Sequence, residues 1–163
     1  MIYFSKNEKD FQEFYRTHGT RVRRTLQGMV GNYSVAEELT QEAFLKGWEK
    51  LSTFGFKSKL STWIYQIAIH TALDWLRSHK VRWSVEMDAV NESDLTPEKR
   101  AVGQALMELD ENTRALLVLH YYEGLSLKEI GQIFKIPEGT VKSRLYQAKA
   151  LLKPLLVNKG FDV

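Results

Sequence analysis

The chain of 163 residues contains no cysteine. Without a thiol it cannot form a disulfide framework, a zinc finger or ribbon, an iron–sulfur cluster or a cysteine nucleophile. This composition argues against a small secreted protein stapled by disulfides and fits a reducing compartment. We therefore expect a cytoplasmic protein.

Long apolar runs are missing as well. No stretch approaches the roughly 18–20 apolar residues that are needed to span a bilayer. The first eleven residues lack the charged-then-apolar order of a signal peptide. We therefore expect no membrane insertion.

Motifs of catalysis and of cofactor binding are also absent. The chain contains no P-loop, no nucleophile elbow and no glycine pattern for a dinucleotide. Its four histidines are scattered, without metal-ligand spacing: His18, His70, His79 and His120. We therefore expect that the protein is not an enzyme and has no catalytic residue, no metal site and no cofactor.

Strand signals are scarce, whereas apolar residues at helical spacing are easy to find. Two segments have the form of a capping box before an apolar stripe, Ser5–Glu8 and Ser34–Glu37. Between them, Gly28, Gly31 and Asn32 are expected to end the first helix. Ser61 has the position of a cap for a third helix.

Later in the chain, Thr96 and Pro97 read as a helix cap followed by proline at the first helical position. Four more helices are expected, near residues 97–108, 112–123, 126–134 and 138–153. The predicted fold class is therefore all-α.

Charge divides the chain into three parts. Residues 1–80 carry a net charge of +4, residues 81–96 carry −3, and residues 97–163 carry +2. The acidic part has few large apolar residues, and they do not recur with helical or strand spacing. We therefore predict two small helical domains, 5–80 and 97–157, joined by a flexible acidic linker over 81–96. The alternative is a surface loop within one domain.

The segment Ser126–Ala150 has the form of a helix-turn-helix. Gly131 is small where the two helices approach, and Pro137 ends one helix and suits the start of the next. The expected core between the helices consists of Ile130, Ile133, Ile136, Val141 and Leu145. The second helix then exposes cations, hydroxyls and an amide, as a major-groove helix does. The alternative is an ordinary helical hairpin with a solvated basic face.

Two earlier helices differ in the charge of their predicted surfaces. Trp63 and Tyr65 lie among cations and hydroxyl groups, which suits stacking on unpaired bases; the alternative is that both rings pack in a core or against a partner. The helix near Glu37 has an acidic front that would repel DNA phosphates. It therefore suits a protein partner with a basic surface, unless it is simply solvated.

Taken in order over about residues 7–155, these segments resemble an extracytoplasmic-function sigma factor of the sigma-70 family. The segments that carry the resemblance are Phe11–Val22, Ala36–Phe44, Phe54–Arg77 and Leu109–Leu145. The resemblance implies a domain 2 and a domain 4, the latter with a helix-turn-helix. It implies a protein that binds core RNA polymerase and directs promoter-specific transcription initiation. Such a protein reads the minus-35 element as duplex and captures unstacked bases of the minus-10 element.

The resemblance also implies roles for individual residues. Core polymerase binding is expected at Glu38, Leu39, Gln41, Glu42 and Phe44. Minus-10 DNA binding is expected at Phe56, Lys57, Ser58, Lys59, Ser61, Thr62, Trp63, Gln66 and His70. Minus-35 DNA binding is expected at Thr140, Lys142, Ser143, Arg144, Tyr146, Gln147 and Lys149. The acidic linker would pass through the RNA exit path of the polymerase, or would merely be soluble.

Some positions depart from the family pattern. His70 stands where the family often has asparagine, Gln147 often has a basic counterpart, and Ile64 replaces the second of two adjacent tryptophans found in primary sigma factors. A single tryptophan implies weaker melting and a need for a closer promoter match. No domain 3 and no acidic inhibitory region at the N-terminus are expected.

Two further questions concern partners. An anti-sigma factor that masks these basic faces is common in the family, and the sequence does not encode its identity. The main alternative function is a free-standing helix-turn-helix transcriptional regulator. It would bind palindromic operators without polymerase.

Overall fold

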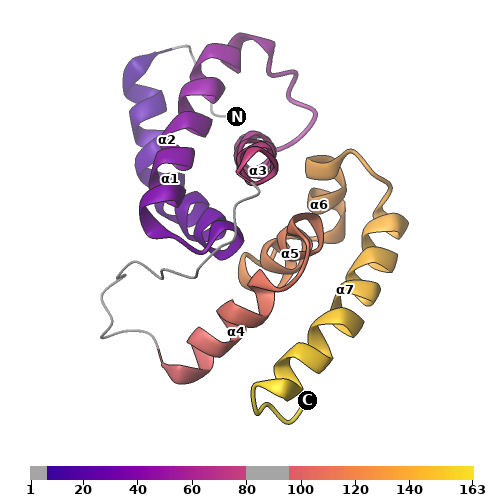
Figure 1. The fold of residues 1–163 in the computed structure, drawn as a ribbon. Helices are drawn as coiled ribbons and strands as arrows, with labels where there is room; N and C mark the ends of the chain where they lie inside the picture. Colours follow the sequence, from indigo (N-terminus) through magenta and orange to yellow (C-terminus); the bar gives the residue numbers. More distant parts are fainter. Residues whose placement is uncertain (1–6, 80–95) are drawn as a thin grey trace.

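The computed structural model describes residues 7–79 and 96–163, and all regular structure within those ranges is helical (Figure 1). The earlier helices form what we call the N-terminal unit, and the later ones form the C-terminal unit. The N-terminal unit consists of α1 (Glu8–Val30), α2 (Tyr33–Lys50), the 3-10 helix η1 (Leu51–Thr53) and α3 (Leu60–Ser78). The C-terminal unit consists of α4 (Pro97–Met107), α5 (Glu111–Leu117), the π-helical turn η3 (Val118–Tyr122), α6 (Leu127–Phe134) and α7 (Glu138–Asn158). The all-α prediction is confirmed.

Helix α1 has a polar cap at its start and a glycine at its end. The side chain of Asn7 accepts a hydrogen bond from the backbone N–H of Lys9 at 3.1 Å. At the other end Gly31 adopts a φ of 72°, and its N–H donates to the carbonyl of Gln27 at 2.8 Å. Glycine adopts this left-handed conformation without steric strain. The predicted end of the helix at Gly31 is therefore confirmed.

The predicted starts of the next two helices are each wrong by two residues. Helix α2 is capped by Asn32, whose side chain accepts from the N–H of Val35 at 2.9 Å, and not by Ser34. Helix α3 is preceded by Lys59, without a side-chain cap, so Ser61 lies inside the first turn. Asn32 was expected to close α1, but the left-handed Gly31 completes that end alone. Asn32 is then available to satisfy the first N–H groups of α2.

The C-terminal unit follows the predicted order with two differences. Thr96 caps α4 by accepting from the N–H of Lys99 at 3.3 Å, and Pro97 is the first helical residue, as predicted. The helix expected over 112–123 divides into α5 and the π-helical turn η3. Helix α7 continues through Pro154 to Asn158, whereas we expected it to end at residue 153.

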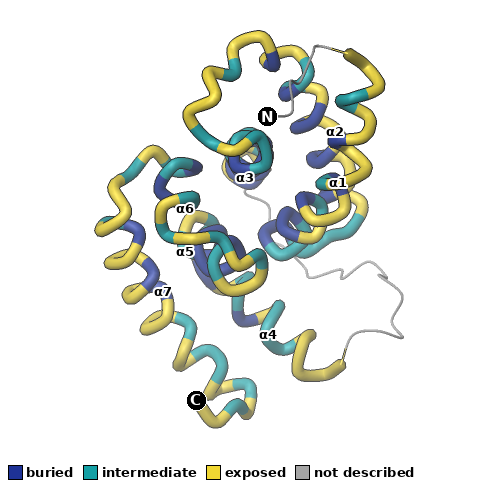
Figure 2. Tube along the Cα trace, turned by 180° about the vertical axis from the view of Figure 1, so that it is seen from behind, coloured by how far each residue is buried: buried dark blue, intermediate teal, exposed yellow. Residues whose placement is uncertain are grey.

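The two units pack against each other and share one apolar core. Figure 1 shows α3 lying beside α5 and α6, and α1 contacts α4 and α5. Buried residues gather where α1, α2 and α3 meet and again along α5 (Figure 2). Val118 of η3 faces Gly28 of α1 so closely that a Cβ atom at residue 28 would lie 3.2 Å from its nearest methyl group. The absence of a side chain at Gly28 therefore permits this contact.

Arg114 of α5 connects the units through backbone atoms. Its buried guanidinium donates to the carbonyls of Leu106 at 2.9 Å, Met107 at 3.3 Å and Leu109 at 2.8 Å. A fourth hydrogen bond reaches the carbonyl of Met29, at the end of α1. One side chain therefore satisfies carbonyls at the C-terminal ends of α4 and α1.

The acidic residues of the predicted linker, Glu86, Asp88, Glu92 and Asp94, lie outside the described residues. Within 7–79 and 96–163, no helix combines the length and apolar character needed to cross a bilayer.

Candidate nucleic-acid interface

Helix α7 divides into a buried face and an exposed polar face. Val141, Leu145 and Ala148 are buried against the rest of the C-terminal unit. Ile130 and Ile133 of α6 are fully buried opposite them, which confirms four of the five predicted core residues of the helix-turn-helix; the fifth, Ile136, is half-buried. Thr140 is half-buried, and the remaining predicted minus-35 residues are exposed: Lys142, Ser143, Arg144, Tyr146, Gln147 and Lys149. The arrangement presents cations and hydrogen-bonding groups on one side of a rigid helix.

The turn between α6 and α7 sets the direction of that face. The backbone N–H of Ile136 donates to the carbonyl of Gly131 at 3.0 Å, and Lys135 adopts a left-handed φ of 54°. A Cβ atom at residue 131 would lie 2.8 Å from the carbonyl oxygen of Ile136. The expectation of a small residue at this close approach is confirmed, and the atom that requires it belongs to the backbone of the turn.

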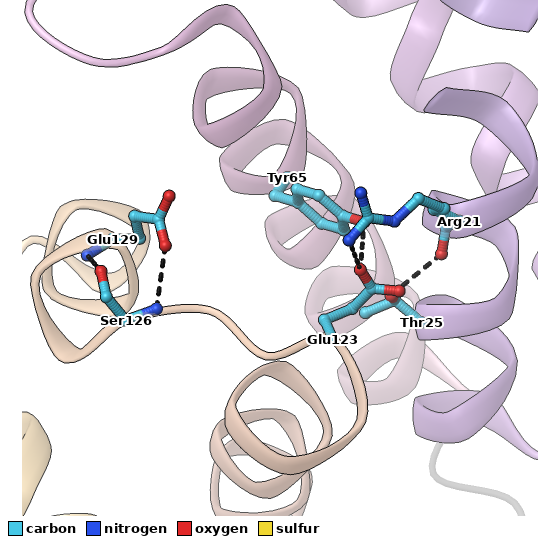
Figure 3. A network of polar contacts seen from close by, with 6 residues as sticks. All are labelled: Arg21, Thr25, Tyr65, Glu123, Ser126 and Glu129. Carbon is cyan, nitrogen blue, oxygen red and sulfur yellow. Dashed lines mark hydrogen bonds and ion pairs between the residues drawn. The ribbon is translucent and has the colours of Figure 1, made fainter. Parts of the chain in front are cut away.

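Ser126 and Glu129 fix the start of α6 through a reciprocal capping box (Figure 3). The N–H of Glu129 donates to the Ser126 hydroxyl at 3.1 Å, and the N–H of Ser126 donates to the Glu129 carboxylate at 2.8 Å. These bonds to Ser126 lower the pKa of Glu129, and Lys59 lowers it further. The first helix of the pair is therefore anchored at its N-terminus by a charged side chain.

An aromatic cluster lies at the start of α3 and consists of Phe54, Phe56 and Trp63. The ring centroid of Phe54 lies 4.8 Å from that of Phe56 and 5.1 Å from that of Trp63. Trp63 is half-buried, whereas Phe56 is 72% exposed and has a left-handed φ of 55°. A large ring held on an exposed loop by an unusual backbone conformation can meet a base that has left the stack.

The other predicted minus-10 residues differ in their access to solvent. Lys57, Lys59 and His70 are exposed, and Ser58, Ser61 and Gln66 are half-buried. Thr62 is buried, with 3% of its surface exposed, so the expected direct contact with DNA is corrected to a packing role inside α3. Although the residue is exposed, partial desolvation of its ring lowers the pKa of His70, and the nearby Lys135 lowers it further.

Tyr65 packs inside the protein. Its ring is 4% exposed, and its hydroxyl donates to the carboxylate of Glu123 at 2.8 Å (Figure 3). Of the two readings that the sequence allowed for this tyrosine, the structure supports packing. Burial raises the pKa of the Tyr65 phenol, and the Glu123 carboxylate raises it further, so the hydroxyl keeps its proton.

The acidic front of α2 is on the surface. Glu38, Gln41 and Glu42 are exposed, and Glu42 pairs with Lys46 at 2.7 Å. Leu39 and Phe44, also expected to contact polymerase, are 3% and 2% exposed. Leu39 therefore packs in the core, and its expected contact with polymerase is corrected to a packing role. Phe44 also packs in the core, and it contributes to the lining of a groove at the surface.

A shallow groove of about 410 Å³ adjoins this acidic front. It is lined by Phe11, Gln12, Tyr15, Arg16, Gln41, Phe44 and Leu45. Leu45 is 66% exposed and Tyr15 39%, and the sequence interpretation did not assign a partner-binding role to either residue. One feature of the sequence could have indicated the exposure of Leu45: it lies off the apolar stripe of α2, directly after Phe44.

Comparison with known families gives two matches in the order of the two units. The sigma-70 region 2 family matches residues 14–82, and the sigma-70 region 4 family matches residues 99–152. The N-terminal unit thus corresponds to region 2 and the C-terminal unit to region 4.

Curated relatives match most of the chain. It is 32% identical over 145 residues to the RNA polymerase sigma-H factor of Pseudomonas aeruginosa, with 74% of this chain and 75% of that protein covered. It is 29% identical over 171 residues to the ECF RNA polymerase sigma factor SigW of Bacillus subtilis, with 93% and 91% covered.

Solved structures share the fold. The sigma factor RpoE of Bartonella quintana, solved with the anti-sigma factor NepR, aligns with a TM-score of 0.76 and 24% identity, covering 91% of this chain and 97% of that one. CnrH, solved with the cytosolic domain of CnrY, aligns with a TM-score of 0.74 and 20% identity, covering 93% and 90%.

A region 2 unit followed by a region 4 unit with a helix-turn-helix defines a bacterial transcription initiation factor. The chain belongs to the sigma-70 family of RNA polymerase sigma factors, within its extracytoplasmic-function group. It binds core RNA polymerase and promoter DNA and directs promoter-specific transcription. The resemblance found in the sequence is confirmed.

Proposed function

We propose that this sigma factor recognises its promoters at two places with two different surfaces. Helix α7 enters the major groove at the minus-35 element, and the aromatic cluster at the start of α3 captures unstacked bases of the minus-10 element. The observation that carries the proposal is the division of α7, with Val141 and Leu145 buried and Lys142 and Arg144 exposed on the other side. A helix held in this way by a helix-turn-helix presents its polar face to base edges.

At the minus-10 element, recognition requires bases that have left the duplex. The exposed ring of Phe56 and the half-buried ring of Trp63 offer stacking surfaces, and Lys57 lies beside them for phosphates. Stacking on one aromatic side chain contributes about 1–3 kcal/mol per base. The stacking surface therefore favours the open promoter over the closed one.

The acidic front of α2 provides the polymerase-docking surface. Glu38, Gln41 and Glu42 supply charge and amide groups, and the adjoining groove offers the exposed apolar side chains of Leu45 and Tyr15. Interfaces commonly combine an apolar centre with a charged rim. This surface is expected to bind a basic helical element of the polymerase clamp.

The bond-forming chemistry of transcription remains with the polymerase, so this chain acts as a recognition and strand-opening factor and not as an enzyme. Its place of action is the cytoplasm, where the polymerase works. One related structure contains the sigma factor RpoE bound to the anti-sigma factor NepR. An anti-sigma factor is accordingly expected to regulate this chain.

The decisive experiment is transcription by purified core polymerase with and without the full chain, on a library of promoter sequences. We expect the chain to select templates that share two separated elements and to copurify with the polymerase. A free-standing regulator would instead bind a palindromic operator in the absence of polymerase, and that result would overturn the proposal.

The docking surface is tested by charge reversal. We expect Glu38→Lys to weaken affinity for core polymerase by a few kcal/mol, because like charges would then meet across the interface. Glu49→Lys is the matched control, since Glu49 is an exposed carboxylate near the other end of the same helix. Equal affinity of the two variants would contradict docking through the front of α2.

A further inference from the structure

The turn η3 brings two tyrosines to the surface of the C-terminal unit. Its hydrogen bonding is π-helical: the N–H of Glu123 donates to the carbonyl of Val118 at 3.0 Å. A π-helical turn holds about one residue more than an α-helical turn, so the side chains at its end point in other directions than a continued α-helix would give them. Tyr121 is 57% exposed and Tyr122 is 63% exposed. Such turns are frequent at functional sites, so the contacts of these two rings bear on function.

The side chains of this turn reach different neighbours. The Glu123 carboxylate pairs with Arg21 of α1 at 3.0 Å (Figure 3). Tyr121 instead meets α7, where the ammonium group of Lys149 lies 5.8 Å from the centroid of the tyrosine ring. An ammonium group within about 6 Å of an aromatic centroid is attracted by the negative face of the ring. Tyr121 is therefore next to a cation of the helix that the proposed function places at the minus-35 element.

The orientation of the Tyr121 ring is fixed by His120. The two rings meet edge to face, with centroids 4.8 Å apart and an angle of 78° between their planes. The Nδ1 atom of His120 lies 3.0 Å from the carbonyl oxygen of Leu125, so it carries the proton and donates to that oxygen. The carbonyl, the imidazole and the tyrosine ring therefore form a chain of contacts that ends at Lys149.

Lys149 lies on the same side of α7 as two other proposed DNA contacts. Lys142, Tyr146 and Lys149 follow at intervals of four and three residues, and all three are exposed. The recognition helix of a helix-turn-helix contacts base edges with its first residues. Lys149 lies about 10 Å further along the helix axis than Lys142, at 1.5 Å per residue. The expected ligand of Lys149 is therefore a phosphate of the DNA backbone.

An exposed lysine loses much conformational freedom when it binds a phosphate, because its four-carbon stem is flexible. A ring that already holds the ammonium group reduces this loss before DNA arrives, and preorganisation of this kind raises affinity. Cation–π attraction at an exposed site corresponds to a factor of about two to five in affinity. The Tyr121 ring is placed to make this contribution.

We propose that Tyr121 is a positioning residue of the minus-35 interface: its ring holds the Lys149 ammonium group where a phosphate of the upstream element meets it, so that the DNA-binding surface extends from α7 onto η3. The inference rests on the proposed function, because it takes α7 to lie on that element. Base preference is not affected, since a phosphate contact acts on all promoter sequences alike.

The test is a double-mutant cycle in the holoenzyme, formed from core polymerase and the full chain, on a duplex promoter that the wild-type protein selects. Its variants are Tyr121→Leu, Lys149→Ala and the two combined, each measured at several salt concentrations. We expect Lys149→Ala to lower the slope of log affinity against log salt concentration by about one. Tyr121→Leu should weaken binding about two- to five-fold in the wild-type background and have no effect in the Lys149→Ala background.

Two further variants serve as controls. Tyr121→Phe keeps the aromatic face and should bind as the wild type does. Tyr122→Leu removes an exposed ring of the same turn and should also bind as the wild type does, because the contact with Lys149 belongs to Tyr121. A loss for Tyr121→Leu that is equal in both backgrounds, or that either control reproduces, would overturn the positioning role. So would unchanged affinity for Tyr121→Leu, or an unchanged salt slope for Lys149→Ala.

The proposed function fails by a different result. If neither Lys142→Ala nor Arg144→Ala changes affinity or preference at the upstream element, α7 does not read that element, and both proposals fail together. If these variants weaken binding and Tyr121→Leu does not, the proposed function stands and only the positioning role of Tyr121 is lost.

Discussion

Phe56 and Trp63 differ in how much of each ring is available to DNA. Trp63 is half-buried beside Phe54, whereas Phe56 is 72% exposed on the loop before α3. Because Trp63 is half-buried, its loss is expected to affect folding as well as the proposed stacking on a base. Phe56 is therefore the residue at which stacking on a base can be measured with the least effect on the fold.

We expect Phe56→Ala to leave binding of the duplex promoter intact and to weaken promoter opening by about 1–3 kcal/mol, because stacking contributes only after bases leave the duplex. Permanganate reactivity of unpaired thymines measures opening, and a template with a preformed bubble should restore transcription. A normal permanganate pattern in the variant would assign Phe56 to a role other than base capture.

Lys142 and Arg144 are both exposed on α7, but we expect different roles for them. Lys142→Ala should cost about 1–3 kcal/mol and relax preference at one base pair of the minus-35 element. Arg144→Ala should weaken binding to all promoter sequences alike. It should also reduce the slope of log affinity against log salt concentration by about the contribution of one phosphate contact.

Promoter selection at several salt concentrations measures both effects. Lys153→Ala provides the control, since it removes an exposed cation further along the same helix. If neither Lys142→Ala nor Arg144→Ala changes preference or affinity at the upstream element, α7 does not read that element.

At the scale of elements, the helix-turn-helix depends on a close approach between Gly131 of α6 and the backbone of the turn that follows. The carbonyl of Ile136 lies where a side chain on Gly131 would begin, and the left-handed Lys135 directs the chain into α7. The orientation of α7, the proposed DNA-reading helix, therefore depends on backbone geometry as much as on the apolar contacts of α6 and α7.

We expect Gly131→Ala to destabilise the chain by about 1–3 kcal/mol, because the added methyl group would overlap backbone. Gly139→Ala is the matched control: a Cβ atom there meets nothing within 4 Å, and alanine favours a helix by up to about 1 kcal/mol over glycine. Chemical denaturation measures both. A Gly131→Ala variant as stable as the Gly139→Ala variant would show that the turn can relax.

Most of the helices and their packing within the helix-turn-helix could be predicted from the sequence. Helical spacing predicted most of the observed helices, and the apolar residues Ile130, Ile133, Val141 and Leu145 identified the core of the helix-turn-helix. Helix starts were less predictable, because Asn32 and Ser34 are both good caps and the choice depends on how the preceding helix ends. The site was predicted by residue type, but Thr62 is buried, which spacing alone did not reveal.

At the scale of the whole molecule, the contact between the units could not be predicted. Tyr65 and Glu123 are 58 positions apart in the chain, and neither belongs to a motif that predicts the other. The sequence instead suggested two domains separated by a linker. The paired carboxylate and the Arg114 hydrogen bonds become evident only once the helices are placed in space.

Arg114 provides a test at this scale. We expect Arg114→Met to lower the free energy of unfolding by about 2–4 kcal/mol, because several buried carbonyls would lose their donor. Arg100→Met is the control, since it replaces an exposed arginine of α4 with the same residue. Thermal and chemical unfolding measure the difference. Equal stability of the two variants would contradict a structural role for the buried guanidinium.

The packing of the C-terminal unit on the N-terminal unit also has a consequence for synthesis. The N-terminal unit leaves the ribosome first, and at about 5–20 residues per second the residues from 96 to 123 take roughly 1–6 s to follow. During that interval Tyr65 and Arg21 have no Glu123 to meet. A nascent chain therefore passes through a period in which the proposed polymerase-docking face of α2 has been made while the contact between the units has yet to form.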